Sequence, residues 1–326
     1  MPPTVSGPAT RTKAHHERPL LVVAHDPGYG ARVAATDGSA QRGRDAARGG
    51  DRATDSVSGG GETHRGHVRE TNQDVIVVEP DLGLYAVLDG MGGANAGDVA
   101  ARLAGETITA CIRQRSRIRR RRPGQLLELA LHTAAVEVFK AAEERLEYRG
   151  MGTTVVACLV VEPARVVVGH AGDSRAYLLR DGRLVALTRD HTVAQRLLDT
   201  GVLRIDELDS SPHRHQLTRN LGRAYDAYPD IVEQTLRPGD RLLLCSDGLY
   251  GGTSERAIRR VLGGRDAPEQ IAHRLVELAL RGTASDNISA VVIAVDGGRA
   301  RAATLRPSSR AQARRPRASG PRTARR

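Results

Sequence analysis

Short apolar runs alternate with longer amphipathic stretches through the middle of the chain. Runs with the length of buried strands lie at 74–79, 84–89, 153–161, 165–172, 175–180, 183–188, 240–247 and 287–295. A period near 3.6 residues predicts helices at 96–118, 124–148, 190–200, 254–263 and 267–281, whereas 201–216 is irregular. Asp181-Gly182, between two of the strands, is a strong signal for a two-residue hairpin turn.

The order of these elements predicts the fold class. Two helices separate one group of strands from the next, and two more precede the last strand, so helices and strands do not alternate one by one. This order argues against a parallel doubly wound sheet. It predicts an α+β sandwich whose sheets are flanked by helices.

The two ends of the chain differ in composition from the middle. Residues 1–56 are rich in Gly, Ala, Ser, Pro and charge, and residues 297–326 are a low-complexity segment with ten Arg and no acid. Both are predicted to be disordered, which leaves one domain at 57–296. This domain holds 31 basic and 32 acidic residues, so the net charge of +11 comes mostly from the tail. The charge therefore says little about what the domain binds.

Apolar runs and cysteines indicate the cellular compartment in which the protein is expected. The apolar runs fall short of the ~20 residues that span a bilayer, and the N-terminus has no apolar stretch of signal-peptide length. Cys111, Cys158 and Cys245 each lie in an apolar segment and form no close-spaced pair. We therefore expect buried free thiols, a reducing compartment and a cytoplasmic location.

Five aspartates stand where a predicted strand begins or ends: Asp74, Asp89, Asp173, Asp247 and Asp286. Each alone has the ordinary interpretation of a turn or cap residue. Together they predict one rim where carboxylates converge and raise each other's pKa unless divalent cations join them. An all-oxygen ligand set points to Mg²⁺ or Mn²⁺, and no Cys or His grouping has zinc-site spacing. His213 and His215 are interpreted as solvated loop residues.

Eight stretches, in order, carry a resemblance to a known family: "RETNQD" (69–74), "LDGMGG" (88–93), "MGTT" (151–154), "GHAGDSRAYLLRDGRL" (169–184), "LTRDH" (187–191), "LTRNLG" (217–222), "GDRLLLCSDGLYG" (239–251) and "SDNIS" (285–289). Over roughly 60–296 the chain resembles the metal-dependent protein phosphatases of the protein phosphatase 2C type, in their bacterial form. The resemblance implies a β-sandwich of two antiparallel sheets flanked by pairs of antiparallel helices.

The resemblance also implies a metal-ligand set. Asp89 matches the carboxylate that bridges two metal ions, and the carbonyl of Gly90 matches a ligand of one of them. Asp247 and Asp286 match ligands of the other ion. Asp74 matches a carboxylate that holds a metal largely through water.

Two further residues match known positions of the family. Asp173 matches the ligand, shared with Asp247, of a third and weaker ion in bacterial members. Arg69 matches the phosphate-binding arginine, whose fork contacts two phosphate oxygens at once. The implied cofactors are two Mn²⁺ or Mg²⁺ ions, with a third at the weaker site.

The implied reaction is hydrolysis of phosphoserine and phosphothreonine by a metal-bridged hydroxide that attacks phosphorus directly. Arg69 and the ions neutralise the equatorial oxygens, and no phosphoenzyme forms. One position departs from the eukaryotic pattern. The His two residues after the bridging Asp, proposed there as the general acid, is Met91 here, and bacterial members often lack it. For His64 and His67, near the first motif, a local turn role is the better interpretation.

Other functions compete with this one. A non-catalytic phosphoprotein-binding scaffold would require lost metal ligands, and none is missing. A nucleic-acid-binding function would rest on the Arg-rich tail and on 113–122, which holds seven Arg, but no aromatic platforms are interleaved with them. Within the phosphatase class, a serine phosphatase of anti-anti-sigma factors on the same fold is the alternative.

The expected partners follow from the resemblance alone. It implies phosphorylated proteins as substrates and a cognate serine/threonine kinase, and we also expect a monomeric chain without a membrane span. Residues 190–216 align with the family's flap beside the active site, a segment that tunes substrate choice.

Overall fold

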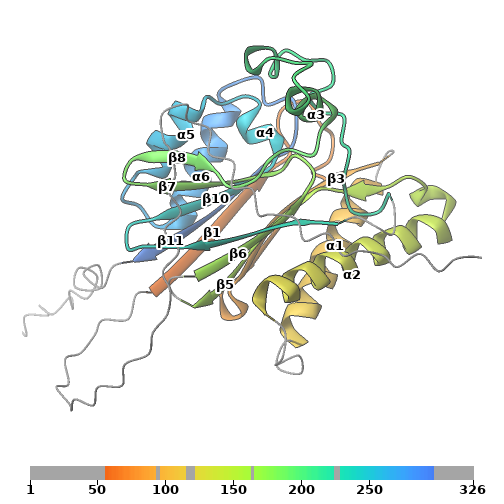
Figure 1. The fold of residues 1–326 in the computed structure, drawn as a ribbon, viewed down its shortest axis with the longest axis horizontal. Coiled ribbons are helices and arrows are strands. Elements are labelled where there is room, and N and C mark those ends of the chain that lie inside the picture. Colours follow the sequence, from red (N-terminus) through yellow and green to blue (C-terminus); the bar gives the residue numbers. More distant parts are fainter. Residues whose placement is uncertain (1–55, 93–95, 115–121, 163–164, 224–227, 297–326) are drawn as a thin grey trace, which may run out of the picture.

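Two sheets and four long helices make up most of the described chain in the computed structural model, which describes residues 56–92, 96–114, 122–162, 165–223 and 228–296. The sheets pack face to face, and helices cover both outer faces (Figure 1). The predicted α+β sandwich is therefore confirmed. The predictions for 1–55, for 297–326 and for most of the arginine run at 113–122 fall outside the described residues.

The first sheet has five strands. Their order is β1 (Ser56–His64), β11 (Ile288–Asp296), β10 (Arg241–Cys245), β7 (Arg175–Arg180) and β8 (Arg183–Ala186). Each neighbouring pair is antiparallel. Asp181 and Gly182, which join β7 to β8, have φ of 50° and 73°. These left-handed conformations are those of the predicted two-residue hairpin turn.

The second sheet has the order β2 (Asp74–Glu79), β3 (Leu84–Met91), β5 (Val155–Glu162), β6 (Arg165–Ala171) and β9 (Asp230–Thr235). The short β4 (Gly152–Thr153) pairs with the end of β3, so the run predicted as one strand over 153–161 is two strands. Thr154 separates them, because its backbone N donates to the Asp89 carbonyl at 2.9 Å and its Oγ1 accepts from the Asp89 N at 3.1 Å.

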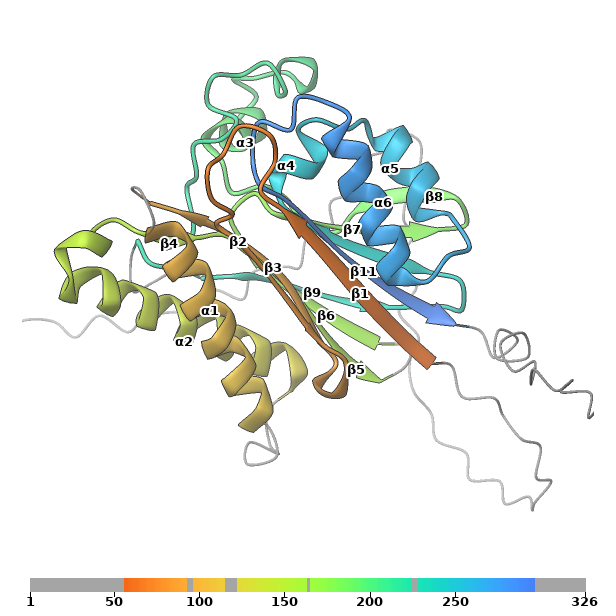
Figure 2. The same cartoon turned by 180° about the vertical axis from the view of Figure 1, so that it is seen from behind.

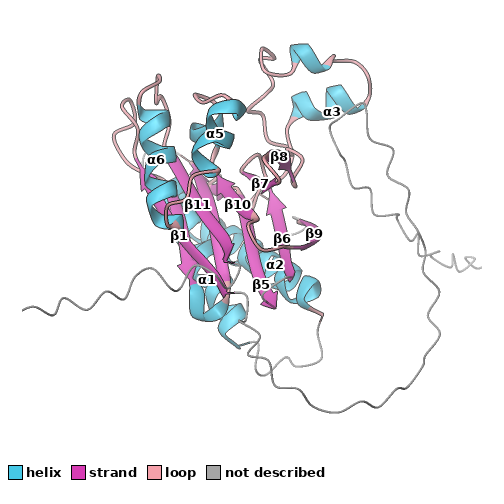
Figure 3. Cartoon of the chain, turned by 90° about the vertical axis from the view of Figure 1, so that its left-hand side faces the viewer, coloured by secondary structure: helices cyan, strands magenta, loops and turns pink. Residues whose placement is uncertain are grey.

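Helices α1 (Ala96–Arg113) and α2 (Pro123–Glu144) cover the second sheet, whereas α5 (Glu255–Leu262) and α6 (Pro268–Leu280) cover the first (Figure 2). Two shorter helices, α3 (Val193–Asp199) and α4 (Asp247–Tyr250), lie near one end of the sandwich, and Figure 3 shows α3 in a segment that projects beyond the sheets. Single 3-10 turns occur at Pro80–Leu82, Leu146–Tyr148 and Ile205–Glu207.

Aliphatic side chains fill the layers of the sandwich. One cluster lies between the sheets and two lie between a sheet and its helices. Cys158 and Cys245 are buried in these layers and Cys111 is half-buried, and all three are free thiols. In the described part of the chain, no helix has the length and apolar character needed to cross a membrane.

The strands β1 and β9 were not predicted. The sequence of β1, SVSGGGETH, has no apolar run, yet it pairs with β11 over its full length. Its glycines allow close packing: a Cβ at Gly59 would lie 2.2 Å from the Tyr85 ring, and a Cβ at Gly60 would lie 2.6 Å from the backbone of Glu269 in α6. The strand is thus held by its neighbours and not by apolar side chains of its own.

Candidate metal centre

The five strand-end aspartates come together at one end of the sandwich. Asp74 and Asp89 are paired across β2 and β3. Asp173 follows β6, Asp247 begins α4 directly after β10, and Asp286 lies two residues before β11. A cavity of about 710 Å³ opens between them, and its walls include Asp89, Asp173, Asp247 and Asp286.

Asp74 lies below the floor of this cavity and is 5 % exposed. Its Oδ2 accepts hydrogen bonds from Ser246 Oγ at 2.8 Å and Ser289 Oγ at 2.7 Å, which fix the carboxylate between the two sheets. Burial raises its pKa from 3.8 to about 7, against the lowering effect of the two hydroxyls. The negative charges of Asp247 and Asp286 raise the pKa of Asp74 further, because they disfavour a third negative charge nearby.

Asp89 and Gly90 lie where β3 reaches the cavity. Burial, followed by the charges of Asp74 and Asp247, raises the pKa of Asp89 well above its usual value. A Cβ at Gly90 would lie 2.0 Å from the carbonyl oxygen of Gly97, in the first turn of α1. The glycine therefore lets the helix start directly against the strand and leaves the backbone beside Asp89 uncovered.

Arg69 lies on the rim, where its Nη2 donates to Asp286 Oδ2 at 2.8 Å. The side chain of Arg69 is 53 % exposed and that of Asp286 36 %. The hydrogen bond to Asp286 raises the pKa of Arg69 further above its usual value. The guanidinium is thus charged, points at the carboxylates and keeps most of its donors free for an incoming anion.

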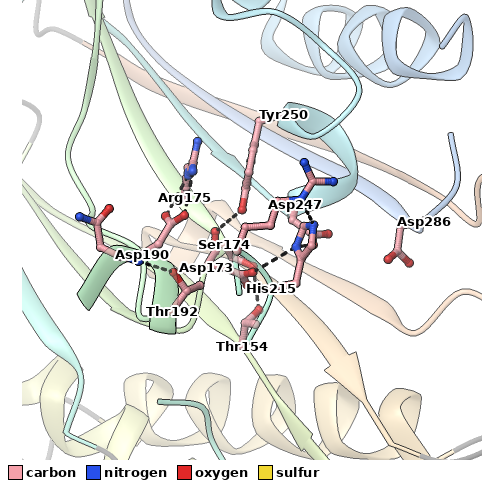
Figure 4. Close-up of polar contacts among 12 residues, drawn as sticks. Thr154, Asp173, Ser174, Arg175, Asp190, Thr192, His215, Asp247, Tyr250 and Asp286 are labelled. Atoms are coloured by element: carbon pink, nitrogen blue, oxygen red, sulfur yellow. Dashed lines mark hydrogen bonds and ion pairs between the residues drawn. The ribbon is translucent and has the colours of Figure 1, made fainter. Parts of the chain in front are cut away.

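His215 lies in the cavity wall beside Asp173 and Asp247 (Figure 4). Its Nδ1 is 3.2 Å from Asp247 Oδ2 and 4.0 Å from Asp173 Oδ2. His215 is a half-exposed loop residue, as expected, but its approach to these two carboxylates was not predicted. His213 does stay within its loop, where Nδ1 bonds Gln216 Oε1 at 2.9 Å. Nothing in the spacing marks His215, because it lies in the irregular stretch 201–216.

Asp173 is 5 % exposed, and burial followed by the charge of Asp247 raises its pKa from 3.8 to about 8. A polar network holds it from behind. Tyr250 Oη donates to the Asp173 carbonyl at 3.0 Å, and the Tyr250 ring packs 3.7 Å under the Arg175 guanidinium. Arg175 in turn makes a two-pronged ion pair with Asp190 at 2.9 and 2.7 Å (Figure 4). The arginine of the "GDSR" stretch is therefore a structural link between Asp173, α4 and the start of the flap.

A second histidine cluster lies outside the cavity and was not predicted. The rings of His170 and His191 stack at 4.3 Å, and His191 Nε2 donates to Asp230 Oδ2 at 3.2 Å. Burial lowers the pKa of His170 from 6.5 to about 4. His191 Nδ1 accepts from the backbone N of Gly172 at 3.2 Å, one residue before Asp173. His170 Nε2 donates to the Arg189 carbonyl at 2.8 Å, so hydrogen bonds from both rings join the end of β6 to the base of the flap.

Three other residues named above make single side-chain contacts. Met91 lines the cavity, and its Sδ accepts from Asn220 Nδ2 at 3.5 Å. His64 Nδ1 accepts from the backbone N of Gly66 at 3.0 Å, as expected for a turn. His67 bonds the Leu280 carbonyl at 2.8 Å, which is a long-range contact and not the local turn expected for it.

Divalent cations fit this arrangement. Asp74 Oδ1 and Asp247 Oδ1 are buried and have no hydrogen-bond partner among the described residues. Among the described residues, the side chains that pair with these carboxylates are Arg69, with Asp286, and His215, with Asp247 and Asp173, and both are half-exposed. Buried charge without a partner costs several kcal/mol per group. Hard cations with oxygen ligands, such as Mg²⁺ and Mn²⁺, would relieve this cost.

Comparisons with known proteins identify the class. The protein phosphatase 2C family model matches residues 61–276, and the chain belongs to this family. The serine/threonine protein phosphatase PstP of Mycobacterium tuberculosis is 40% identical over 233 residues, which cover 70% of this chain and 43% of that protein. The serine/threonine phosphatase stp of Listeria monocytogenes is 31% identical over 241 residues, 72% of this chain and 94% of that protein. The chain thus matches less than half the length of the mycobacterial relative.

Solved structures agree with the fold. The crystal structure of the M. tuberculosis phosphatase PstP/Ppp has a TM-score of 0.66 at 35% identity, covering 74% of this chain and 99% of that one. The catalytic domain of PstP in complex with two manganese ions has a TM-score of 0.64 at 34% identity, covering 74% and 98%. The family and the sandwich fold predicted from the sequence are both confirmed.

Proposed function

We propose that this chain is a metal-dependent phosphoprotein phosphatase that hydrolyses phosphoserine and phosphothreonine. The observation that carries the proposal is the convergence of four carboxylates on one cavity, with Asp74 paired to Asp89 behind them and the exposed Arg69 guanidinium on the rim. The relative solved with two manganese ions, the serine threonine protein phosphatase PstP, supports the same assignment.

Each side chain has a part in this proposal. Asp89, Asp247 and Asp286, with the Gly90 carbonyl, would hold two Mn²⁺ or Mg²⁺ ions, and Asp74 would support them from below. Asp173 would hold a third ion together with Asp247. When bound, the ions supply Lewis-acid stabilisation of the phosphoryl group and lower the pKa of water for attack on phosphorus.

The protein's own groups bind and orient the substrate. Arg69 offers a planar fork of donors to two phosphate oxygens, and its charge compensates the charge that develops there. The hydroxyls of Ser246 and Ser289 hold the Asp74 carboxylate in one orientation. Met91 lies in the cavity wall but has no proton to give, so protonation of the leaving oxygen comes from elsewhere in the cavity.

A covalent thiol mechanism does not fit the chain. Burial raises the pKa of Cys158 and of Cys245 to about 12, and neither lines the cavity. A thiol with this pKa is protonated at neutral pH and is a poor nucleophile. Direct attack by water is therefore the reaction that the site supports.

We further propose phosphorylated proteins as substrates, a serine/threonine kinase as the opposing partner and a role in signal transduction. The free cysteines suit a reducing compartment such as the cytoplasm. The presence of all five candidate carboxylates argues against a non-catalytic scaffold.

The test is phosphate release from phosphoserine, phosphothreonine and phosphotyrosine peptides, measured with Mn²⁺, with Mg²⁺ and with a chelator. Release from the first two peptides only, and only with a metal, is expected. Asp89→Asn should be inactive, whereas Asp181→Asn is a matched control at an exposed Asp-Gly turn between β7 and β8. Equal rates with metal and with chelator, after exhaustive metal removal, would contradict the proposal.

A further inference from the structure

The flap, residues 190–216, ends at a histidine that faces the metal centre. Backbone contacts fix both ends of the flap: Thr192 bridges Leu217, and Val193 N donates to the Gln216 carbonyl at 2.8 Å. His215 directly precedes this bridge. Its side chain therefore starts from an anchored backbone position and not from the tip of a loop.

The distances around His215 match those between ligands of one ion. In an octahedral site with bonds of about 2.1 Å, neighbouring ligand atoms lie about 3 Å apart and opposite ones about 4.2 Å apart. His215 Nδ1 lies 3.2 Å from Asp247 Oδ2 and 4.0 Å from Asp173 Oδ2. All three donor atoms lie within 4.8 Å of one another.

The acidic side of this triad lacks other partners. Asp173 is 5 % exposed, and Asp247 Oδ1 is buried with no hydrogen-bond partner among the described residues. The backbone carbonyl of Asp173 accepts a hydrogen bond from Tyr250 Oη at 3.0 Å, which fixes the main chain from which the carboxylate projects. One buried carboxylate, one half-buried carboxylate and one half-exposed imidazole thus face the same point of the cavity.

We infer that His215 is a nitrogen ligand of a cation held by Asp173 and Asp247, so that the flap is tied directly to the metal centre. The inference rests on the proposed function, because it concerns the third ion of that same site. The flap then supplies a sixth side chain, in addition to the five aspartates, that coordinates an ion of the metal centre. It also changes the chemistry of the third site from all-oxygen to mixed oxygen and nitrogen, which favours Mn²⁺ over Mg²⁺.

One local rearrangement accompanies binding. Arg214 Nε donates to His215 Nε2 at 2.7 Å, so the proton of the neutral ring lies on Nδ1 and points at Asp247. Coordination through Nδ1 moves that proton to Nε2, where the Arg214 donor no longer fits. Arg214 is exposed and also donates to the Asp209 carbonyl at 2.7 Å, so it has another partner when it leaves the ring.

A second interpretation of His215 predicts the opposite change in Mn²⁺ affinity when its side chain is removed. If His215 is only a counter-ion that neutralises Asp247 in the metal-free chain, then a cation must displace it. Removing the side chain would then leave Mn²⁺ affinity at the third site unchanged or higher. If His215 is a ligand, removing it lowers that affinity by at least about tenfold, the lower end of the effect seen when even an outer-shell partner is lost.

The experiment compares the full chain with His215→Ala and with His213→Ala, a matched control two residues away whose ring bonds Gln216 within the flap. Calorimetry with Mn²⁺ gives the number and affinity of bound ions, and pulsed electron paramagnetic resonance detects a ¹⁴N coupling from a coordinated imidazole. Melting temperatures of all three proteins show whether the fold is kept.

A weakened third site and loss of the ¹⁴N coupling in His215→Ala, with both retained in His213→Ala, would support the inference. Unchanged or tighter binding without any ¹⁴N coupling in the wild-type chain would overturn it, even if two ions bind and phosphopeptides are hydrolysed. Absence of Mn²⁺ uptake and of phosphatase turnover in the wild-type chain would overturn the proposed function as well.

Discussion

Lowering the pH from about 8.5 to about 6.5 in a chelator should stabilise the folded chain. Buried carboxyl groups of the metal centre have folded pKa values of about 7 for Asp74 and about 8 for Asp173, against 3.8 for an ordinary carboxyl. As the pH falls through these values, the folded state takes up protons that the unfolded state does not bind. Stability is therefore gained below the folded pKa and lost above it.

The size of the effect follows from the two pKa values. Between the folded and unfolded pKa of a group, the free energy of unfolding changes by about 1.4 kcal/mol per pH unit. Over the two pH units of this experiment, Asp173 contributes about 2 kcal/mol and Asp74 about 1 kcal/mol to the free energy of unfolding. Burial also raises the pKa of Asp89 well above its usual value.

Urea unfolding at four pH values, with chelator and with saturating Mn²⁺, measures this effect. Asp173→Asn should lose about 2 of the about 3 kcal/mol in chelator. Bound Mn²⁺ keeps the carboxylates ionised, so the gain should vanish with the metal. The window stops near pH 6.5 because His170, with a folded pKa of about 4 against 6.5, destabilises the fold below that pH. A metal-free stability that stays flat or falls from pH 8.5 to 6.5 would refute the reasoning.

Three other changes have definite expected results. Asp247→Asn should remove nearly all phosphopeptide turnover at saturating Mn²⁺ while circular dichroism stays normal, because one charge holds several others in place; a rate near wild type would mean that the ligand is misassigned. Gly90→Ala should cost about 3 kcal/mol in urea unfolding because its Cβ would lie 2.0 Å from Gly97 O, whereas Gly252→Ala, which has open space around it, should cost little. Deleting 297–326 should leave peptide hydrolysis unchanged; a large loss of turnover would place the tail in the catalytic domain.

The sequence predicted the parts of the fold whose pattern is local. Apolar runs such as Leu84–Leu88 and the Asp181-Gly182 turn carry their structure in neighbouring residues. The Gly-rich strand β1 does not, because it is held by β11, by the Tyr85 ring and by α6. Its glycines are informative only once those neighbours are known.

The same distinction holds for the site. The aspartates could be found because each stands at the end of a strand, and strand ends meet at the edges of sheets. His215 could not, because its approach to Asp247 depends on how the flap crosses the cavity and returns at Leu217. The stacked pair His170 and His191 was missed for a similar reason, since β6 and the base of the flap meet only in three dimensions.

One titration tests the central claim most directly. The metal-depleted chain is titrated with Mn²⁺ while phosphate release from a phosphothreonine peptide and the number of bound ions are followed in the same preparation. The account predicts no release without metal, a rate that rises to its plateau as the ions of the carboxylate centre fill, and no release at any Mn²⁺ concentration from Asp89→Asn. Full release by the metal-depleted chain, or a near wild-type plateau with Asp89→Asn, would contradict it.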